Sequence, residues 1–244
     1  SYDTTTVRAS IGNYLLGKYI SKYSDAKVIM NGDGSDELCG GYLYFHCVPD
    51  NIEFDRECYR LLYNIHKYDV LRSDKCISSH GLEPRTPFLD RSWVNYYMSI
   101  PVHIRNHTVT GNIEKFLLRK AFSEEHYGSI LLPPEILQRS KEAFSDGVSK
   151  QTRSLYEIIQ EHIGKKDCMN MVYKDANYLE AFNDEQRYYI SVFDKHYKNC
   201  GNIIDYYWMP LYIDAHDASA RTLNIYNTKN NNRSSEEKNV TTCQ

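Results

Sequence analysis

The chain has 244 residues, of which 41% are hydrophobic and 25% are charged, and its formal net charge is -3. These values suit one large domain or two small ones, and they exclude global disorder. A slightly acidic chain has no basic surplus, so we expect no nucleic-acid partner. No apolar run approaches the length that crosses a bilayer, so we expect no membrane partner.

Residues 4–22 form the first predicted element. Apolar residues recur there at four-residue spacing, namely Val7, Ile11, Leu15 and Tyr19. This spacing predicts an amphipathic helix whose apolar stripe faces the core. The next apolar run, KVIM at 27–30, is too short for a helix and predicts a buried strand.

A mostly helical remainder is expected after Phe45. Amphipathic stretches typical of helices lie near 51–68, 70–80, 89–99, 112–126, 151–163 and 176–198. No second strand is recognised clearly, so the fold class is α/β with one or two strands and a helical covering. We expect residues 1–226 to be the folded portion. The asparagine-rich tail, 227–244, predicts disorder.

The seven cysteines are odd in number, scattered and without a C-x-x-C pair. This pattern argues against a disulfide framework and against a structural zinc site. Free thiols persist in a reducing compartment, so we expect a cytoplasmic protein.

The segment NGDGSDELCGG directly follows the predicted strand. Ligands of parallel sheets bind beyond the carboxyl ends of the strands. Gly32 and Gly34 allow tight turns and a close approach of a ligand to the backbone. A helix beginning near Ser35 offers free amides to a phosphate, and Asp33 and Asp36 are suitable ligands for Mg²⁺. The alternative is a solvated turn with an Asp or Ser helix cap.

The longer stretch NGDGSDELCGGYLYF resembles the serine-glycine-glutamate-glycine-serine-aspartate-glutamate segment of glutamine-dependent asparagine synthetases. Further stretches resemble motifs of that family in the same order: YDTTTVRAS, YDVLRSDKCISSHGLEPRTPFLD, EKFLLRKAF, RSKEAFSDGV, and WMP followed by DASARTLNIY. The resemblance implies the end of a parallel-sheet domain of the adenine-nucleotide alpha-hydrolase type. It also implies an enzyme, a carbon–nitrogen ligase that uses aspartate, ATP, Mg²⁺ and ammonia from glutamine.

The resemblance also implies roles for individual residues of the strand-end segment. Asn31 and Gly32 match the pair that contacts the adenylate, and asparagine replaces the family's serine. Asp33 matches the glutamate tied to forming the β-aspartyl-AMP intermediate and to handling ammonia, and it is one methylene shorter. Asp36 matches the Mg²⁺ ligand. Lys141 matches the lysine that faces the α-phosphate and pyrophosphate.

Thr5 and Arg8 lie one turn apart, and the resemblance places both at the nucleotide and aspartate site. The remaining charged residues near these motifs are assigned no catalytic role. Lys115 and Arg119 share a helix face at four-residue spacing. They could face phosphate, but we expect both to be surface charges. A further set is expected to form a buried salt-bridge network: Asp69, Arg72, Asp74 and Lys75.

The family's amino-terminal cysteine, glutaminase domain and pyrophosphate loop have no match in these 244 residues. We therefore expect a fragment that needs the missing half as a partner and is inactive alone, with the strand at 27–30 lacking its parallel neighbours. A homodimer is left open. The alternatives are a non-catalytic remnant that binds nucleotide or a partner subunit, and a β-lactam-forming relative on the same scaffold.

Overall fold

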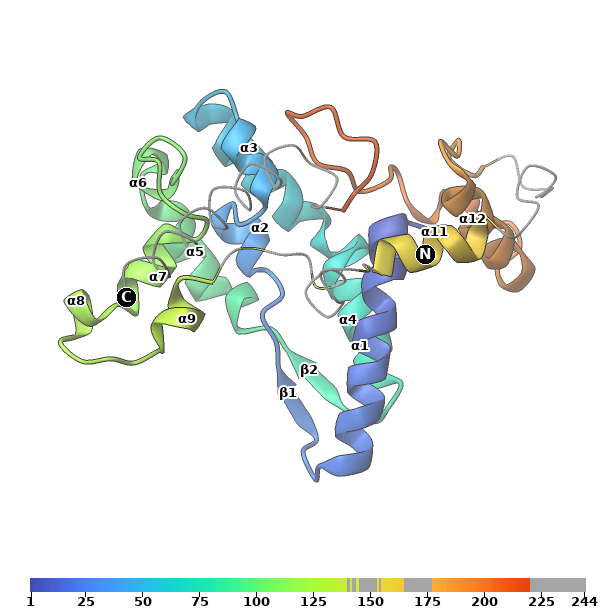
Figure 1. Ribbon diagram of the computed structural model, residues 1–244, viewed down its shortest axis with the longest axis horizontal. Helices are drawn as coiled ribbons and strands as arrows, with labels where there is room; N and C mark the ends of the chain where they lie inside the picture. Colours follow the sequence, from blue (N-terminus) through green and yellow to red (C-terminus); the bar gives the residue numbers. More distant parts are fainter. Residues whose placement is uncertain (140, 142–143, 145–152, 154, 165–176, 220–244) are drawn as a thin grey trace, which may run out of the picture.

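The computed structural model describes residues 1–139, 141, 144, 153, 155–164 and 177–219. The disordered tail predicted at 227–244 lies outside these residues. Helices α1, α4 and the strand pair occupy the centre of Figure 1, with α5 to α9 on one side and α11 and α12 on the other. Within the described residues, no helix is long and apolar enough to cross a membrane.

Helix α1, Thr4–Tyr23, begins where the sequence predicts it. The buried carboxylate of Asp3 caps it by accepting a hydrogen bond from the Thr6 backbone nitrogen at 2.8 Å. The predicted orientation of its apolar stripe is wrong, because Ile11, Leu15 and Tyr19 are 41%, 57% and 62% exposed. The buried face carries small and polar residues, which allows α1 to pack closely along α4, Asp69–Ser78.

Strand β1, Val28–Met30, pairs in parallel with strand β2, Glu83–Arg85. The expectation that β1 lacks a parallel neighbour is therefore wrong. Strand β2 was not recognised because it spans three residues and has a proline at its centre, which favours a turn or an edge position. The prediction of a buried strand is also wrong, because Val28 and Met30 are 47% and 70% exposed.

The other helices follow the predicted stretches to different degrees. The region 51–68 forms a helix and a 3₁₀ turn, and 89–99 contains one helix. The region 112–126 breaks in two, and the predicted helix at 176–198 begins only at Asp184, where Asn183 caps it. The remaining elements are α2 Ser35–Cys39, η1 Leu43–Cys47, α3 Asn51–Asn64, η2 Ile65–Lys67, η3 Pro87–Leu89, α5 Arg91–Ser99, α6 Val102–Arg105, α7 Phe116–Ala121, α8 Glu124–Tyr127, α9 Pro134–Leu137, α11 Leu155–Ile163, α12 Asp184–His196 and η4 Gly201–Ile203.

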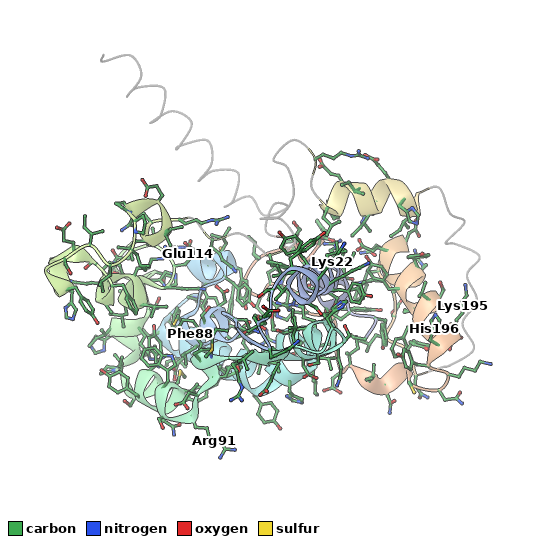
Figure 2. All side chains as sticks on the ribbon, turned by 90° about the horizontal axis from the view of Figure 1, so that it is seen from below. Lys22, Phe88, Arg91, Glu114, Lys195 and His196 are labelled. Atoms are coloured by element: carbon green, nitrogen blue, oxygen red, sulfur yellow. The ribbon has the colours of Figure 1, made fainter. Side chains whose placement is uncertain are left out.

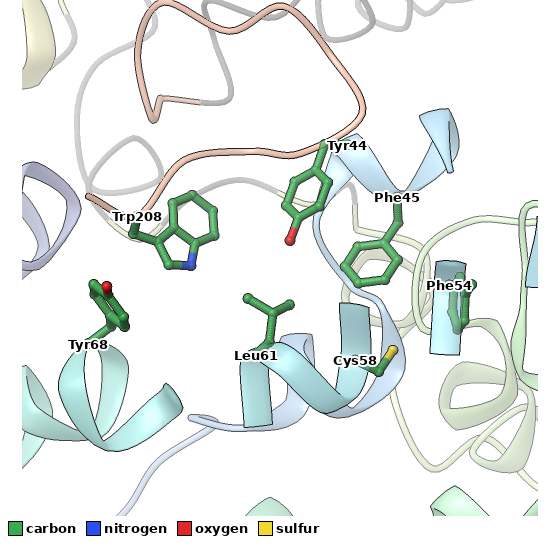
Figure 3. Close-up of a cluster of buried hydrophobic side chains, with 7 residues drawn as sticks. All are labelled: Tyr44, Phe45, Phe54, Cys58, Leu61, Tyr68 and Trp208. Atoms are coloured by element: carbon green, nitrogen blue, oxygen red, sulfur yellow. The ribbon is translucent and has the colours of Figure 1, made fainter. Parts of the chain in front are cut away.

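An aromatic core joins the early and late parts of the described chain (Figure 3). Its buried members are Tyr44, Phe45, Phe54, Cys58, Leu61, Tyr68 and Trp208. Each large side chain buried in this way contributes about 1.5–3 kcal/mol. The cluster holds η1, and with it the preceding α2, against the segment that follows η4.

A second cluster fastens the start of the chain to α12. Tyr2 is fully buried beside Phe193 and Tyr207. Its hydroxyl donates to the carbonyl oxygen of Gly201 at 2.6 Å. The Trp208 backbone nitrogen also donates to Asp3 Oδ1 at 2.8 Å. The start of α1 is therefore held beside α12 and the segment that follows η4.

Candidate functional site

The segment after β1 forms a turn at the carboxyl end of the parallel strand pair. The backbone nitrogen of Asn31 continues the ladder by donating to Arg85 O at 2.9 Å, and its side-chain amide donates to Ser73 Oγ at 2.7 Å. Gly34 has φ 91, a conformation that favours glycine, and it begins α2. A Cβ built on Gly32 would meet nothing within 4 Å, so a ligand can approach this backbone.

Asp36 is held between two lysines that are distant in the sequence. Its Oδ2 lies 3.0 Å from Lys141 Nζ, and its Oδ1 lies 2.9 Å from Lys115 Nζ. Burial alone would raise the pKa of Asp36, but the two ammonium groups outweigh it and lower the pKa to about 2. The carboxylate is therefore ionised throughout the physiological range.

Lys115 and Arg119 contradict the expectation that they are surface charges. The Lys115 side chain is 19% exposed and ion-paired with Asp36. Arg119 Nε donates to Glu114 O at 2.7 Å, and its Nη2 donates to Arg139 O at 2.9 Å. The sequence signal for Lys115 is its place in the EKFLLRKAF motif, but nothing in that motif alone indicates that its ammonium turns inward.

Asp33 lies on the side of the turn that faces α4. Burial raises the pKa of its carboxyl group, and Arg72 and Ser73 oppose that shift. Its Oδ2 is buried and has no hydrogen-bond partner among the described residues. A carboxylate with a raised pKa and a vacant acceptor oxygen can take a proton from a bound nucleophile.

The expected network on α4 is partly confirmed. Asp69 and Arg72 pair at 2.5 Å, and both side chains are largely buried. Asp74 and Lys75 pair at 3.0 Å, but their side chains are 50% and 73% exposed, so the expectation that they are buried is wrong. The buried pair supports the wall behind Asp33.

Glu37 is a buried acid that the sequence did not single out. Its side chain accepts a hydrogen bond from the Tyr42 hydroxyl. Burial, Asp69 and Asp36 together raise the pKa of Glu37 to about 8, so its carboxyl group is protonated at neutral pH. Lys141 Nζ lies 5.2 Å from the centre of the Tyr42 ring, which joins this group to the Asp36 cluster.

Arg8 lies in a buried cluster formed with α12 and the carboxyl-terminal segment. It donates to Glu185 through Nε and Nη2 at 2.8 and 2.6 Å, and to Asp217 through Nη1 and Nη2 at 2.7 and 2.8 Å. Its guanidinium also lies 4.9 Å from the ring centre of Tyr156. Most of its donors are thus used by the chain itself.

A cavity of about 80 Å³ lies between these clusters. Its lining includes Thr5, Arg8, Tyr42, Asp69, Lys141 and Trp208. The Thr5 hydroxyl is buried and has no hydrogen-bond partner among the described residues. Lys141 therefore contacts Asp36 on one side and faces this cavity on the other.

Metal binding at Asp36 would need ligands besides the side chains that the structure describes. No group of three or more His, Cys, Asp or Glu side chains in the described part is arranged around a common metal position. Mg²⁺ commonly binds through one or two carboxylates together with substrate phosphates and water. The single acid Asp36 fits that mode, provided that a phosphate replaces its lysine partners.

Comparison with known proteins gives consistent matches. The sequence matches the family described as Asparagine synthase over residues 1–53 and 47–201. It is 44% identical to an asparagine synthetase [glutamine-hydrolyzing] of Gallus gallus over 230 residues, covering 93% of this chain and 40% of that relative. The human protein of that name is 44% identical over 232 residues, with the same coverage, and the Mus musculus protein is 42% identical over 229 residues. The chain thus spans about two fifths of the length of these relatives.

Proposed function

The chain belongs to the asparagine synthase family, and from that premise we propose that it supplies part of the synthetase site of an ATP-dependent asparagine synthetase. In the proposed reaction, the side-chain carboxylate of aspartate attacks the α-phosphate of ATP and releases pyrophosphate. Ammonia from glutamine then attacks the β-aspartyl-AMP, forming asparagine and releasing AMP. Glutamine cleavage is assigned to sequence outside these 244 residues.

The observation that carries this proposal is the meeting of Lys141 and Asp36. Their side chains lie 3.0 Å apart at the end of β1, although 105 positions separate them in the chain. The Lys141 ammonium would neutralise charge that builds up on the α-phosphate and pyrophosphate. Asp36 would hold Mg²⁺ delivered with the nucleotide, and bound metal would stabilise the leaving pyrophosphate.

The neighbouring turn is proposed to hold the adenylate and to accept a proton. Asn31 is anchored to Ser73, which leaves the open backbone of Gly32 available to the adenylate. Asp33 would take a proton from the attacking ammonia, because its buried carboxyl group has a raised pKa.

The cavity beside Lys141 is proposed to receive aspartate. Thr5 would form a hydrogen bond with this substrate, because its buried hydroxyl has no hydrogen-bond partner among the described residues. For Arg8 we propose a supporting role, in place of the direct binding implied by the resemblance. Its guanidinium already makes four hydrogen bonds to Glu185 and Asp217, so it shapes and charges the cavity wall.

A chimera tests this function directly. The 244 residues would replace the matching part of the Gallus gallus relative, and asparagine, AMP and pyrophosphate would be measured with aspartate, ATP and ammonium. We expect the three products in equal amounts and a loss of at least about 100-fold in kcat for Lys141→Met. Lys120→Met, an exposed lysine on α7, is the matched control. A folded chimera that forms no asparagine would refute the proposal.

The 244 residues alone are proposed to form no asparagine. Strand β1 pairs with β2 on one edge, and its Val28 and Met30 side chains are exposed, so the described sheet is narrow for a nucleotide site. Sustained turnover by the purified chain would contradict this. The non-catalytic alternative is favoured if the chimera binds ATP in calorimetry without making asparagine. Such a result would be explained by the four hydrogen bonds that already occupy the Arg8 guanidinium, since they leave it few donors for a substrate.

A further inference from the structure

Tyr42 follows a sharp turn at the end of α2. Gly40 has φ 61, in the left-handed region, and a Cβ added there would lie 2.5 Å from Phe54 Cζ, so a larger residue would displace Phe54. The Gly41 backbone nitrogen closes the turn by donating to Asp36 O at 2.7 Å. The glycine pair therefore folds the chain back along α2, which brings Tyr42 beside the cavity.

The Tyr42 ring is restrained by three neighbouring side chains. Its hydroxyl donates to the buried carboxyl group of Glu37 on α2. Its ring centre lies 5.1 Å from that of Trp208 and 5.8 Å from that of Tyr44, and the Tyr44 ring is nearly parallel to it, at 13°. A hydrogen bond to a buried acid and two aromatic contacts restrict the rotation of the ring. Tyr42 therefore presents its ring in a fixed orientation.

The 3₁₀ helix η1 begins directly after Tyr42 and is anchored at its far end. His46 Nε2 on η1 lies 2.8 Å from the carboxylate of Glu114, which is labelled in Figure 2. Between these two ends, Tyr44 and Phe45 are buried in the aromatic core. The backbone on the carboxyl side of Tyr42 is thus held in place as well as its side chain.

The Lys141 ammonium is attracted by two groups. Asp36 Oδ2 accepts its hydrogen bond at 3.0 Å, and the centre of the Tyr42 ring lies 5.2 Å from its Nζ. The same carboxylate pairs with Lys115 at 2.9 Å, so the two ammonium groups repel each other. An aromatic ring face attracts a cation through its quadrupole and offsets part of this repulsion. Because Lys141 is only 17% exposed, water and salt screen these interactions weakly.

We propose that Tyr42 is a positioning residue, which holds the Lys141 ammonium beside Asp36 and directs it at the cavity. That this placement serves the transfer of AMP to aspartate rests on the proposed function. The contact between the ring and the ammonium rests on the geometry alone. The alternative, in which Tyr42 only fills space beside the aromatic core, predicts a loss of stability on substitution without a specific effect on Lys141.

Nuclear magnetic resonance tests the contact on the 244-residue chain without an assay of activity. Methylene protons beside the face of an aromatic ring shift upfield, and Lys141→Arg identifies the Lys141 signals in a sample that contains isotope-labelled lysine. We expect an upfield shift of the Lys141 Cε protons in the parent and in Tyr42→Phe, and its loss in Tyr42→Leu. An ordinary position of these signals in the parent would overturn the inference.

The kinetics of the chimera measure the consequence for the reaction. Tyr42→Leu should lower kcat by about tenfold, whereas Tyr42→Phe, which keeps the ring, should stay within about threefold of the parent. Tyr212→Leu is the matched control, since Tyr212 also packs against the aromatic core and donates to a glutamate, Glu53, at 3.0 Å. Its Tm should fall, but its kcat should stay within about twofold of the parent.

A double-variant cycle separates positioning from a purely structural role. Tyr42→Leu should cause little further loss of kcat once Lys141→Met has removed the ammonium, because the ring acts through that group. Losses that multiply in the double variant, or a loss in Tyr42→Leu confined to KM for aspartate, would overturn the inference. If Tyr42→Leu folds poorly by circular dichroism, Tyr42→Met replaces it in the same cycle, with the same expected results.

The outcome is distinguishable from that of the proposed function. A chimera that forms no asparagine, in a protein whose Lys141 signals still depend on the Tyr42 ring, would refute the function and leave the contact in place. A chimera that forms asparagine with an unchanged kcat in Tyr42→Leu would overturn the inference and leave the function intact.

Discussion

Two buried ionic clusters of this molecule have opposite charge balance. Around Asp36, one carboxylate faces two lysines, whereas around Arg8 one guanidinium faces two carboxylates. In the Arg8 cluster the acids have further donors: Tyr189 reaches Glu185 at 2.8 Å, and the Ser219 backbone nitrogen reaches Asp217 at 2.8 Å. In the Asp36 cluster the surplus lies on the donors, which is the arrangement that an incoming anion can complete.

This difference indicates different roles for the two clusters. In the Arg8 cluster, four hydrogen bonds already link the guanidinium to its two acids. The cluster joins α1 to α12 and the carboxyl-terminal segment, so we expect it to contribute to the stability of the fold. The Asp36 cluster is unsaturated and lies at the end of a parallel strand pair, where ligands bind. The predictions below test this distinction, in order of decreasing effect on the folded state.

Arg8→Met should produce the largest loss. It leaves Glu185 and Asp217 buried without their cation, which destabilises the fold by about 3–5 kcal/mol and lowers Tm by about 6–20 °C. Arg56→Met is the control, because its pair with Glu53 lies on the surface and Arg56 is 68% exposed. A Tm of Arg8→Met within about 2 °C of the parent would show that the cluster does not stabilise the fold.

Asp36 should make stability fall in acid. Its pKa is about 2 in the fold against an ordinary 3.8, so its contribution is fully present above about pH 4 and is lost as the pH falls through 2. The loss amounts to about 2 kcal/mol. Urea unfolding at pH 5, 3 and 2 should show this loss in the parent and in the exposed control Asp25→Asn. A fall of the same size in Asp36→Asn would contradict the assignment.

Gly41→Ala should destabilise the fold by about 1–3 kcal/mol, because the new methyl group overlaps Lys115 and Asp36. Gly32→Ala is a matched control for stability, since a Cβ there meets nothing within 4 Å. We expect the free energy of unfolding of this control to stay within about 0.5 kcal/mol of the parent. Equal effects of the two substitutions in urea unfolding would disprove the close approach at Gly41.

Lys115→Met should have the smallest effect on stability, about 0–1 kcal/mol, because Lys141 continues to pair with Asp36. A small loss of Tm in this variant would be the sharpest contrast with Arg8→Met, whose loss of stability should be large. A loss of Tm in Lys115→Met as large as that of Arg8→Met would remove the distinction between the clusters.

Local patterns predicted many of the helices and the strand-end turn. The spacing of apolar residues in 4–22 and 51–68, and the glycine-interrupted acids after KVIM, identify helices and a turn because those signals lie within a few residues of one another. The same signals place Asp36 near the start of a helix, and it lies in the first turn of α2. The roles assigned to individual site residues remain predictions, namely those of Thr5, Asn31, Gly32, Asp33, Asp36 and Lys141.

The sequence by itself determined the helical pattern, the turn after β1 and the residue types in that turn. These features depend on residues that are close together along the chain. The tertiary structure decided the rest. It paired β1 with the proline-containing β2, left the apolar stripe of α1 exposed, saturated Arg8 with acids from distant segments and turned Lys115 inward through the space at Gly41. The physical reason is that a side chain's partner and burial depend on packing between segments far apart in the chain, which local spacing does not encode.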